Sequence, residues 1–429
     1  MSGPTTPHAD EYSDAEKRLI QRRTVQTLLA SQVCGGIGLV SGISVTVLLA
    51  YDLSGSKTVA GLTAACLSVG AAVVSFPLAR LMARAGRRPG LLAGYLVGSA
   101  GTFVAALAAL TGVYLLLPFG VLAIGAASAA NLATRYAAAD LARDDRRAST
   151  IGLIVWASTI GSGFGSLFSL WLIDPAGRSL GLPEYAGPYL IGAVLLLAAA
   201  AIVGLRLRPD PLVVAGGIRQ ASQPRLPFTR SMALILAHPR ARIAVLAMAL
   251  VQAVMVGTMT LTPLHMKDGH QGGTAISVLL FGHIMGMYLL SPVVGVFADR
   301  FGRYPMLFGA GVLCVFGALY AGATPAHEFA GLALGQAAIG LAWCMGIISA
   351  SGLLTESFPV TQRASVQGAG DLCMAACGAI AGVSAGGIVA SRSYLDLNVV
   401  AAVLGGILVV AVLYTVVANR GRPAIAMAS

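Results

Sequence analysis

Twelve long apolar segments dominate this chain of 429 residues, and each has the length of one bilayer-spanning helix. A helix rises about 1.5 Å per residue, so about 20 apolar residues cross a hydrocarbon layer of ~30 Å. Because a bilayer interior holds no water to bond a free backbone, such segments must be helices. The segments lie at about 25–50, 58–82, 90–111, 113–139, 148–172, 188–207, 241–264, 274–298, 305–324, 328–354, 364–390 and 395–418. The sequence therefore predicts an all-α membrane protein with 12 transmembrane helices.

The composition excludes an ordinary soluble protein and several classes of partner. Hydrophobic residues make up 57% of the chain and charged residues only 10%, against about 25% charged in soluble domains. The net charge is +11, but the basic residues cluster between apolar segments, where they act as topology signals. All six cysteines lie inside apolar segments without a metal-binding or disulfide spacing. We expect the lipid bilayer as a partner, no nucleic acid, no metal and no cofactor.

The distribution of Lys and Arg predicts the orientation. Of the 28 basic residues, 24 fall on the side of the N-terminus, and the other four are Lys57, Arg178, Lys267 and Arg392. Cytoplasmic loops carry the excess of Lys and Arg. The sequence therefore predicts a multi-pass protein of the cell membrane with both termini in the cytoplasm.

The chain divides at a proline-rich break into two sets of six segments. Residues 1–23 are predicted as a cytoplasmic tail, 24–207 as the first six-helix half and 240–418 as the second. Residues 208–239 hold five prolines and scattered arginines, which favours a cytoplasmic linker, and 419–429 form a second tail.

The two halves repeat each other at one constant offset, which is half the length of the chain. Pairs with this same spacing occur in two different loops: Arg84 and Arg300, Gly86 and Gly302, Arg87 and Arg303, Asp140 and Glu356, Arg147 and Arg363. Because six spans separate the copies, both have the same direction through the bilayer. The sequence predicts two pseudo-symmetric halves, related by an axis along the membrane normal, with a cavity between them.

A known loop signature recurs in both copies. The pattern Gly-x-Leu-Ala-Asp-Arg-x-Gly-Arg-(Arg/Lys) is matched by Gly295-Val296-Phe297-Ala298-Asp299-Arg300-Phe301-Gly302-Arg303. The first copy has Ala79 in place of the leading Gly and Ala83 in place of the Asp. On these residues the chain resembles the major facilitator superfamily of secondary transporters. The resemblance covers nearly the whole chain.

The resemblance implies that these loops form a cytoplasmic gate, which holds neighbouring helix ends together in the outward-facing state. The alternative is a solvated turn that only follows the charge rule for cytoplasmic loops. The gate would consist of Asp299, Arg300, Gly302, Arg303, Arg84, Gly86, Arg87, Asp140, Arg147, Glu356 and Arg363.

The fifth segment also resembles the glycine-rich stretch of the superfamily's drug/proton antiporters at Gly161–Ser166. Ser166 replaces the usual proline, and close helix packing explains the glycines equally well.

Charged residues inside the apolar segments are few, and each is a candidate site because charge is costly in hydrocarbon. Asp371 lies eight residues past Arg363, roughly 12 Å along the eleventh helix at about 1.5 Å per residue. By the same rise, Arg135 and Asn131 lie about 8 and 14 Å inside the fourth helix. We predict that Asp371 pairs with Arg135 in one state and takes up a proton when another state separates them. The alternatives are a permanent ion pair or an Arg135 that extends to the membrane surface.

Further polar and polarizable residues are predicted to serve protons or substrate. His283, on the eighth segment, is a second candidate for proton coupling or a packing histidine. A substrate cavity is predicted from Gln32, Asn131, Gln252, Met255, Met259, Gln336 and Trp343. Helix–helix contacts account for the same polar residues equally well.

These features predict an alternating-access transporter of a small organic molecule, acting as a monomer and most simply as a proton-coupled exporter. One alternative is a proton-coupled uptake symporter, and a second is a soft-metal exporter that uses His283, Met285 and Met287. An enzyme is not expected, because the sequence has no HExxH motif and no paired carboxylates inside the apolar segments. A nucleotide-driven pump is excluded by the missing Walker-type phosphate loop.

Overall fold

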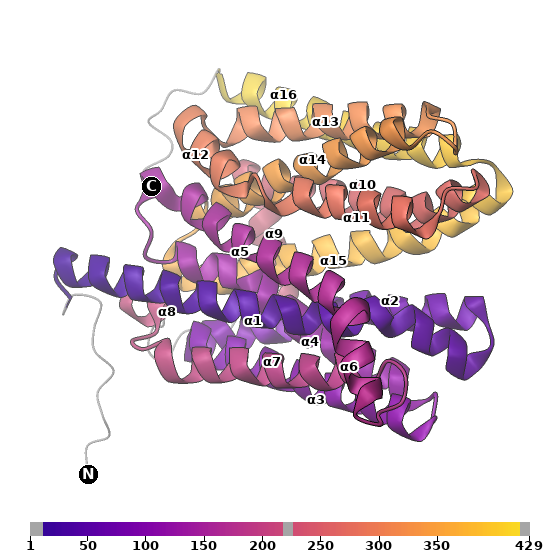
Figure 1. The fold of residues 1–429 in the computed structure, drawn as a ribbon. Coiled ribbons are helices and arrows are strands. Elements are labelled where there is room, and N and C mark those ends of the chain that lie inside the picture. The colour runs from indigo at the N-terminus through magenta and orange to yellow at the C-terminus, as the bar shows by residue number, and fades with distance from the viewer. Residues whose placement is uncertain (1–11, 218–225, 421–429) are drawn as a thin grey trace, which may run out of the picture. The chain divides into compact units, whose positions relative to one another are not determined.

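The computed structural model describes residues 12–217 and 226–420, which are largely helical and contain no strand (Figure 1). The long helices of the first half are α1 (Asp14–Ser54), α2 (Lys57–Ala85), α3 (Arg87–Thr111), α4 (Leu116–Ala139), α5 (Arg147–Phe168) and α7 (Ala186–Arg206). Those of the second half are α10 (Pro239–Asp268), α11 (Gly273–Tyr288), α12 (Ser291–Phe301), α13 (Arg303–Ala323), α14 (Phe329–Glu356), α15 (Val360–Ser391) and α16 (Tyr394–Arg420). The all-helical prediction is confirmed.

Eleven helical segments of the described residues are long and apolar enough to cross a membrane. They match every predicted span except 148–172. That span forms α5, a π-helical turn at Ser169–Ile173 and the start of α6 (Asp174–Ser179). The predicted span 274–298 is divided into α11 and α12, because Pro292 cannot donate a backbone hydrogen bond to the preceding turn.

The segments predicted as tails and linker are partly helical. The first helix begins well before the predicted span, because Ser13 and Glu16 form a capping box that closes its N-terminus. The linker contains α8 (Pro211–Val214) and α9 (Phe228–Ala237). Residues 1–11, 218–225 and 421–429, which belong to the predicted tails and linker, lie outside the described residues.

The helices group by contact into two units, and α15 is divided between them. Unit 1 consists of the chain up to Met232 together with Phe358–Ala376, and unit 2 consists of Ala233–Ser357 together with the chain from Cys377 onward. Small residues let the helices within each unit approach closely. In unit 1, a Cβ added to Gly36 of α1 would lie 3.0 Å from the Cα of Gly161 in α5. In unit 2, one added to Gly317 of α13 would lie 2.7 Å from the carbonyl oxygen of Gly335 in α14.

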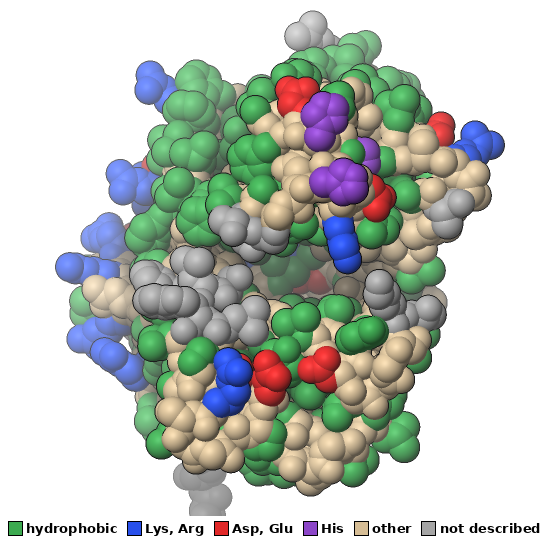
Figure 2. Space-filling view, turned by 45° about the vertical axis from the view of Figure 1, so that its right-hand side comes forward, with side chains coloured by type: hydrophobic (Ala, Val, Ile, Leu, Met, Phe, Trp, Pro, Cys, Tyr) green, Lys and Arg blue, Asp and Glu red, His purple; other side chains and the backbone are tan. Residues whose placement is uncertain are grey.

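Large apolar side chains lie on the outside of both units, as expected for surfaces that face lipid. Figure 2 shows hydrophobic side chains over much of the visible face. Phe119 in unit 1 is 69% exposed and Val383 in unit 2 is 72% exposed. A soluble protein rarely leaves so much apolar surface uncovered. The polar groups that matter for function are therefore expected inside the units.

The repeat seen in the sequence recurs in the backbone. Gly86 joins α2 to α3 with φ 98° and ψ 171°, and Gly302 joins α12 to α13 with φ 92° and ψ 164°. Only glycine adopts this region readily. A similar side-chain contact also occurs in both halves, because Thr46 bonds the Tyr189 hydroxyl at 2.9 Å and its counterpart Thr262 bonds the Tyr394 hydroxyl at 2.8 Å, although the two tyrosines do not share the offset of the repeat.

Gly86→Ala is expected to destabilise the protein more than Gly302→Ala. Both substitutions place a Cβ on a backbone that favours glycine, at a cost of about 1–3 kcal/mol each. At position 86 the new Cβ would also collide with the carboxylate of Asp210, which accepts the Arg88 amide at 2.7 Å. At position 302 its nearest neighbour would be the Pro305 Cδ, 3.9 Å away.

Thermal unfolding in detergent, followed by tryptophan fluorescence, measures the difference. Gly406→Ala is the control, since its Cβ would meet nothing within 4 Å and its backbone φ is not positive. Equal melting temperatures for the Gly86→Ala and Gly406→Ala proteins would contradict the assigned role of Gly86.

Candidate functional site

A buried salt bridge inside unit 1 joins α4 to the first part of α15. Nη2 of Arg135 lies 2.5 Å from Oδ1 of Asp371, and the two side chains are 1% and 8% exposed. Tyr136 completes the group, because its hydroxyl donates to Asp371 Oδ1 at 3.2 Å and accepts from Arg135 Nη2 at 2.9 Å. The Arg135 guanidinium also lies 4.2 Å from the centre of the Tyr136 ring. Burial without water makes each of these bonds stronger than at a protein surface.

A second buried group lies one turn earlier on α15. Arg87, at the start of α3, donates from Nε and Nη2 to the two carboxylate oxygens of Asp140 at 2.7 and 3.0 Å, which is the fork geometry of a strong pair. Nη2 also donates to Oε1 of Gln367 at 2.7 Å. Gln367 precedes Asp371 by four residues, so both side chains lie on one face of α15.

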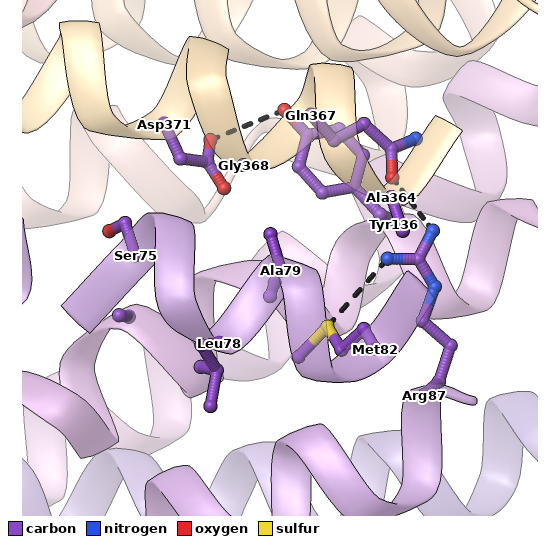
Figure 3. Close-up of a pocket in the computed structure, with 12 residues that line it drawn as sticks. Ser75, Leu78, Ala79, Met82, Arg87, Tyr136, Ala364, Gln367, Gly368 and Asp371 are labelled. Atoms are coloured by element: carbon purple, nitrogen blue, oxygen red, sulfur yellow. Dashed lines mark hydrogen bonds between the residues drawn. The ribbon is translucent and has the colours of Figure 1, made fainter. Parts of the chain in front are cut away.

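A small pocket lies among these groups within unit 1. Figure 3 shows the Tyr136 hydroxyl joined to Asp371, and Arg87 joined to Gln367 and to Met82. The lining comes from α2, α3, α4 and α15: Ser75, Leu78, Ala79, Met82, Arg87, Ala129, Ala133, Tyr136, Ala364, Gln367, Gly368 and Asp371. The pocket therefore brings the predicted coupling acid and a residue of the predicted gate to one place.

Unit 2 contains the repeated form of the Arg87 pair. Arg303 Nη2 donates to Oε1 of Glu356 at 2.7 Å, and Nη1 donates to Oδ1 of Asp299 at 2.7 Å. The guanidinium is thus held by two carboxylates of its own unit.

Other predicted gate residues do not join these pairs. Arg84 and Arg300 are exposed, and Arg300 lies 5.7 Å from the centre of the Phe301 ring. Arg147 pairs with Asp144 at 2.6 Å, and Arg363 donates to the backbone carbonyl of Phe358 at 3.1 Å. The constant offset identified the loops, but it did not distinguish their buried arginines from their exposed ones.

The predicted cavity residues of unit 1 hydrogen-bond to one another. Gln32 of α1 donates to the side-chain oxygen of Asn131 and, at 2.8 Å, to the hydroxyl of Ser158 in α5. The Thr134 hydroxyl donates to Gln32 Oε1 at 2.7 Å. This network ties α1, α4 and α5 together beside the Arg135 turn.

The predicted cavity residues of unit 2 fall into two groups. Gln252 of α10 accepts from the indole nitrogen of Trp343 at 2.7 Å, and Trp343 packs edge-on against Tyr288 with ring centres 5.7 Å apart. Met255 and Met259 lie farther along α10 and are partly exposed.

The second group of unit 2 contains the predicted histidine. His283 is 1% exposed, and its Nδ1 lies 2.7 Å from the backbone carbonyl of Gln336. The Gln336 side chain donates to the hydroxyl of Thr262 at 2.7 Å. In the described part of the chain, no three His, Cys, Asp or Glu side chains are grouped so that they would hold a metal ion.

Two residues of the site were missed by sequence reasoning, namely Tyr136 and Gln367. A signal existed for both. Tyr136 follows the intramembrane Arg135 directly, and Gln367 stands one helical turn before Asp371. Neither side chain carries a charge, so the criterion of a charge buried in lipid did not identify either of them.

Known proteins similar to this chain agree with the fold. The sequence model of the Major Facilitator Superfamily matches residues 28–282 and 245–426. The MFS-type transporter YdeG of Bacillus subtilis is 34% identical over 418 residues, which cover 96% of this chain and 95% of YdeG. The riboflavin transporter RfnT of Brucella anthropi is 26% identical, over 88% of this chain and 92% of RfnT.

Among solved structures, the human organic anion transporter MFSD10 superimposes with a TM-score of 0.72 at 15% sequence identity. The match covers 92% of this chain and 99% of MFSD10, and it concerns the fold. With the family match over nearly all its spans and the repeated pairs of its two halves, the chain belongs to the major facilitator superfamily of membrane transporters.

Proposed function

We propose that this chain is a proton-coupled secondary transporter of a small organic molecule, working by alternating access in the cell membrane. The buried pair of Asp371 and Arg135 is the observation that carries the proposal. An acid inside a membrane-spanning helix is costly, and such residues commonly mark proton relays and substrate pathways. Asp371 also sits on the one long helix that the two units share, so a change in its charge acts where the units are joined by the chain.

The proposed coupling uses the charge of Asp371 as a switch. While Asp371 is ionised, charge-assisted bonds from Arg135 and a bond from Tyr136 hold the first part of α15 on α4. A proton on Asp371 removes the charge, weakens those bonds and favours a state in which this part of α15 has moved away. Binding of substrate to one state and of the proton to the other then couples their movements.

We propose export in exchange for protons, with uptake in symport as the alternative. The similarity to RfnT, a riboflavin transporter, favours a flat organic molecule as the first compound to test. Gln32, Asn131, Gln252, Met255, Met259, Gln336 and Trp343 remain the proposed cavity residues, and His283 remains a proposed second proton site. The excess of Lys and Arg on one side supports cytoplasmic termini, and we propose a monomer as the working unit.

Transport into and out of reconstituted vesicles under an imposed pH gradient tests this proposal. Riboflavin and a panel of metabolites and drug-like cations are first screened for binding by thermal shift, and binders are then followed in vesicles. We expect movement of substrate against the direction of proton flow. Movement together with protons would establish the symport alternative. Transport indifferent to the pH gradient would contradict proton coupling altogether.

A further inference from the structure

The two copies of the signature loop differ at the residue four positions before the buried arginine. In the second copy this residue is Asp299, which accepts from Nη1 of Arg303 at 2.7 Å. In the first copy it is Ala83, whose side chain offers no acceptor. Nη1 of Arg87 instead faces the sulfur of Met82 at 3.7 Å, and a thioether is a weak acceptor.

Arg87 therefore has a different set of partners from Arg303. Arg303 binds two carboxylates of its own unit, those of Asp299 and Glu356. The Arg87 guanidinium binds the carboxylate of Asp140 and adds the side-chain oxygen of Gln367 at 2.7 Å. Arg87 and Gln367 are both 1% exposed, so the bond forms away from water.

Only one of the two symmetric positions can make this contact. The counterpart of Gln367 at the offset of the repeat is Ile151 in α5, which is fully buried and apolar. In the second copy, Arg303 is neutralised by two acids, and Ile151, the residue equivalent to Gln367, has no side-chain acceptor to offer it. In the first copy Asp299 has no acidic counterpart at position 83, and the arginine side chain bonds an amide on α15 instead, while the Asp210 carboxylate accepts from the neighbouring Arg88 amide.

The position of Gln367 links this contact to the proposed proton switch. Gln367 and Asp371 are one turn apart on the part of α15 that belongs to unit 1. One binds Arg87 at the start of α3, and the other binds Arg135 and Tyr136 of α4. Any movement that withdraws this turn of α15 must break both contacts together.

We propose that Gln367 is a positioning residue whose bond to Arg87 acts as a latch, and that Ala83 keeps Arg87 available for it. The latch holds the start of α15 in place while Asp371 is paired, and its role in transport rests on the alternating-access cycle proposed above. A hydrogen bond from a charged group to a neutral amide is strong enough to bias two states but weaker than a buried ion pair, so it can break in each cycle. Arg303, which binds the two acids Asp299 and Glu356, keeps its partners in this scheme.

Spin-label distances in the solubilised protein test the latch. Labels are placed on Asp145→Cys and Phe301→Cys, two exposed residues of unit 1 and unit 2, after the six native cysteines are replaced. Gln367→Met removes the acceptor, and Ala83→Asp gives Arg87 the second acid that Arg303 has. Both are expected to raise the ratio of the longer to the shorter distance on the order of tenfold, the effect of losing one hydrogen bond to a charged group. Gln367→Glu, which turns the contact into an ion pair, is expected to lower the same ratio.

Gln21→Met is the matched control, because it removes a 2.7 Å side-chain bond between α1 and the Ala138 carbonyl that does not involve α15. Its distance distribution is expected to equal that of the parent protein. If Ala83→Asp fails to fold, Gln367→Met decides alone. Unchanged distances in Gln367→Met would overturn the latch. The readout needs neither substrate nor a pH gradient, so that outcome would leave proton-coupled transport standing.

Discussion

Asp371→Asn is expected to abolish transport driven by a pH gradient while leaving exchange of substrate across the membrane in place. The asparagine keeps the shape of the side chain and an oxygen that accepts from Arg135 and Tyr136, so the helix packing survives. It cannot gain or lose a proton, so the equilibrium between states no longer responds to pH. Gradient-driven transport should fall to the level of vesicles without protein, whereas counterflow between labelled and unlabelled substrate should persist.

Asp145→Asn is the control for this experiment. Asp145 also pairs with an arginine, Arg143 at 3.0 Å, but the two side chains are 58% and 75% exposed. An exposed pair contributes little, so this variant should transport like the parent protein. Gradient-driven transport that survives in Asp371→Asn would remove Asp371 from the coupling mechanism.

Asp140→Ala is expected to cost far more stability than Glu356→Ala, although the two acids are equivalent in the repeat. The Asp140 side chain is fully buried, and its loss leaves Arg87 as a buried cation with the Gln367 amide as a neutral partner. Removing one partner of a buried pair typically costs about 3–5 kcal/mol. The Glu356 side chain is 22% exposed, and Arg303 would keep its bond to Asp299. We expect a smaller loss there.

The double replacement Arg87→Met with Asp140→Leu distinguishes lost charge balance from lost packing. It removes both charges and fills similar volume, which is often neutral for stability. Most of the melting temperature lost in Asp140→Ala should therefore return, as measured by thermal unfolding in detergent. Equal losses for Asp140→Ala and Glu356→Ala would contradict the partner sets described for the two arginines.

Much of the fold was predictable because the bilayer leaves few solutions. Long apolar segments must be helices, and the constant offset between the two copies of each loop required two similar halves. The depth of Asp371 and Arg135 followed from the rise per residue of an α-helix, and the two side chains do form a salt bridge. These inferences needed only length, period and charge.

The remaining features depend on backbone direction and side-chain contacts that a sequence does not specify. Arg84 and Arg87 are three residues apart, but Gly86 breaks the helix between them, so helical spacing gives no indication of which one is buried. The division of the eighth span before Pro292 likewise depends on how one turn relaxes around a missing donor.

Uncharged polar residues were the hardest to assign. Gln32 and Gln252 were predicted either to line a cavity or to make helix–helix contacts, and in the structure one bonds Asn131 and the other accepts from Trp343. Polarity indicates that such a side chain needs a partner, but the partner lies on another helix, far away in the sequence in both cases. Gln367 was missed for the same reason.

Infrared difference spectroscopy of the solubilised protein across the pH range of transport gives the most direct test of Asp371 as the coupling acid. A protonated carboxyl group has a carbonyl stretching band that the carboxylate lacks. We expect acidification to produce such a band in the parent protein and a weaker one in Asp371→Asn, because the variant lacks one carboxyl group that takes up a proton. Identical difference spectra from the two proteins would show that Asp371 does not take up the proton.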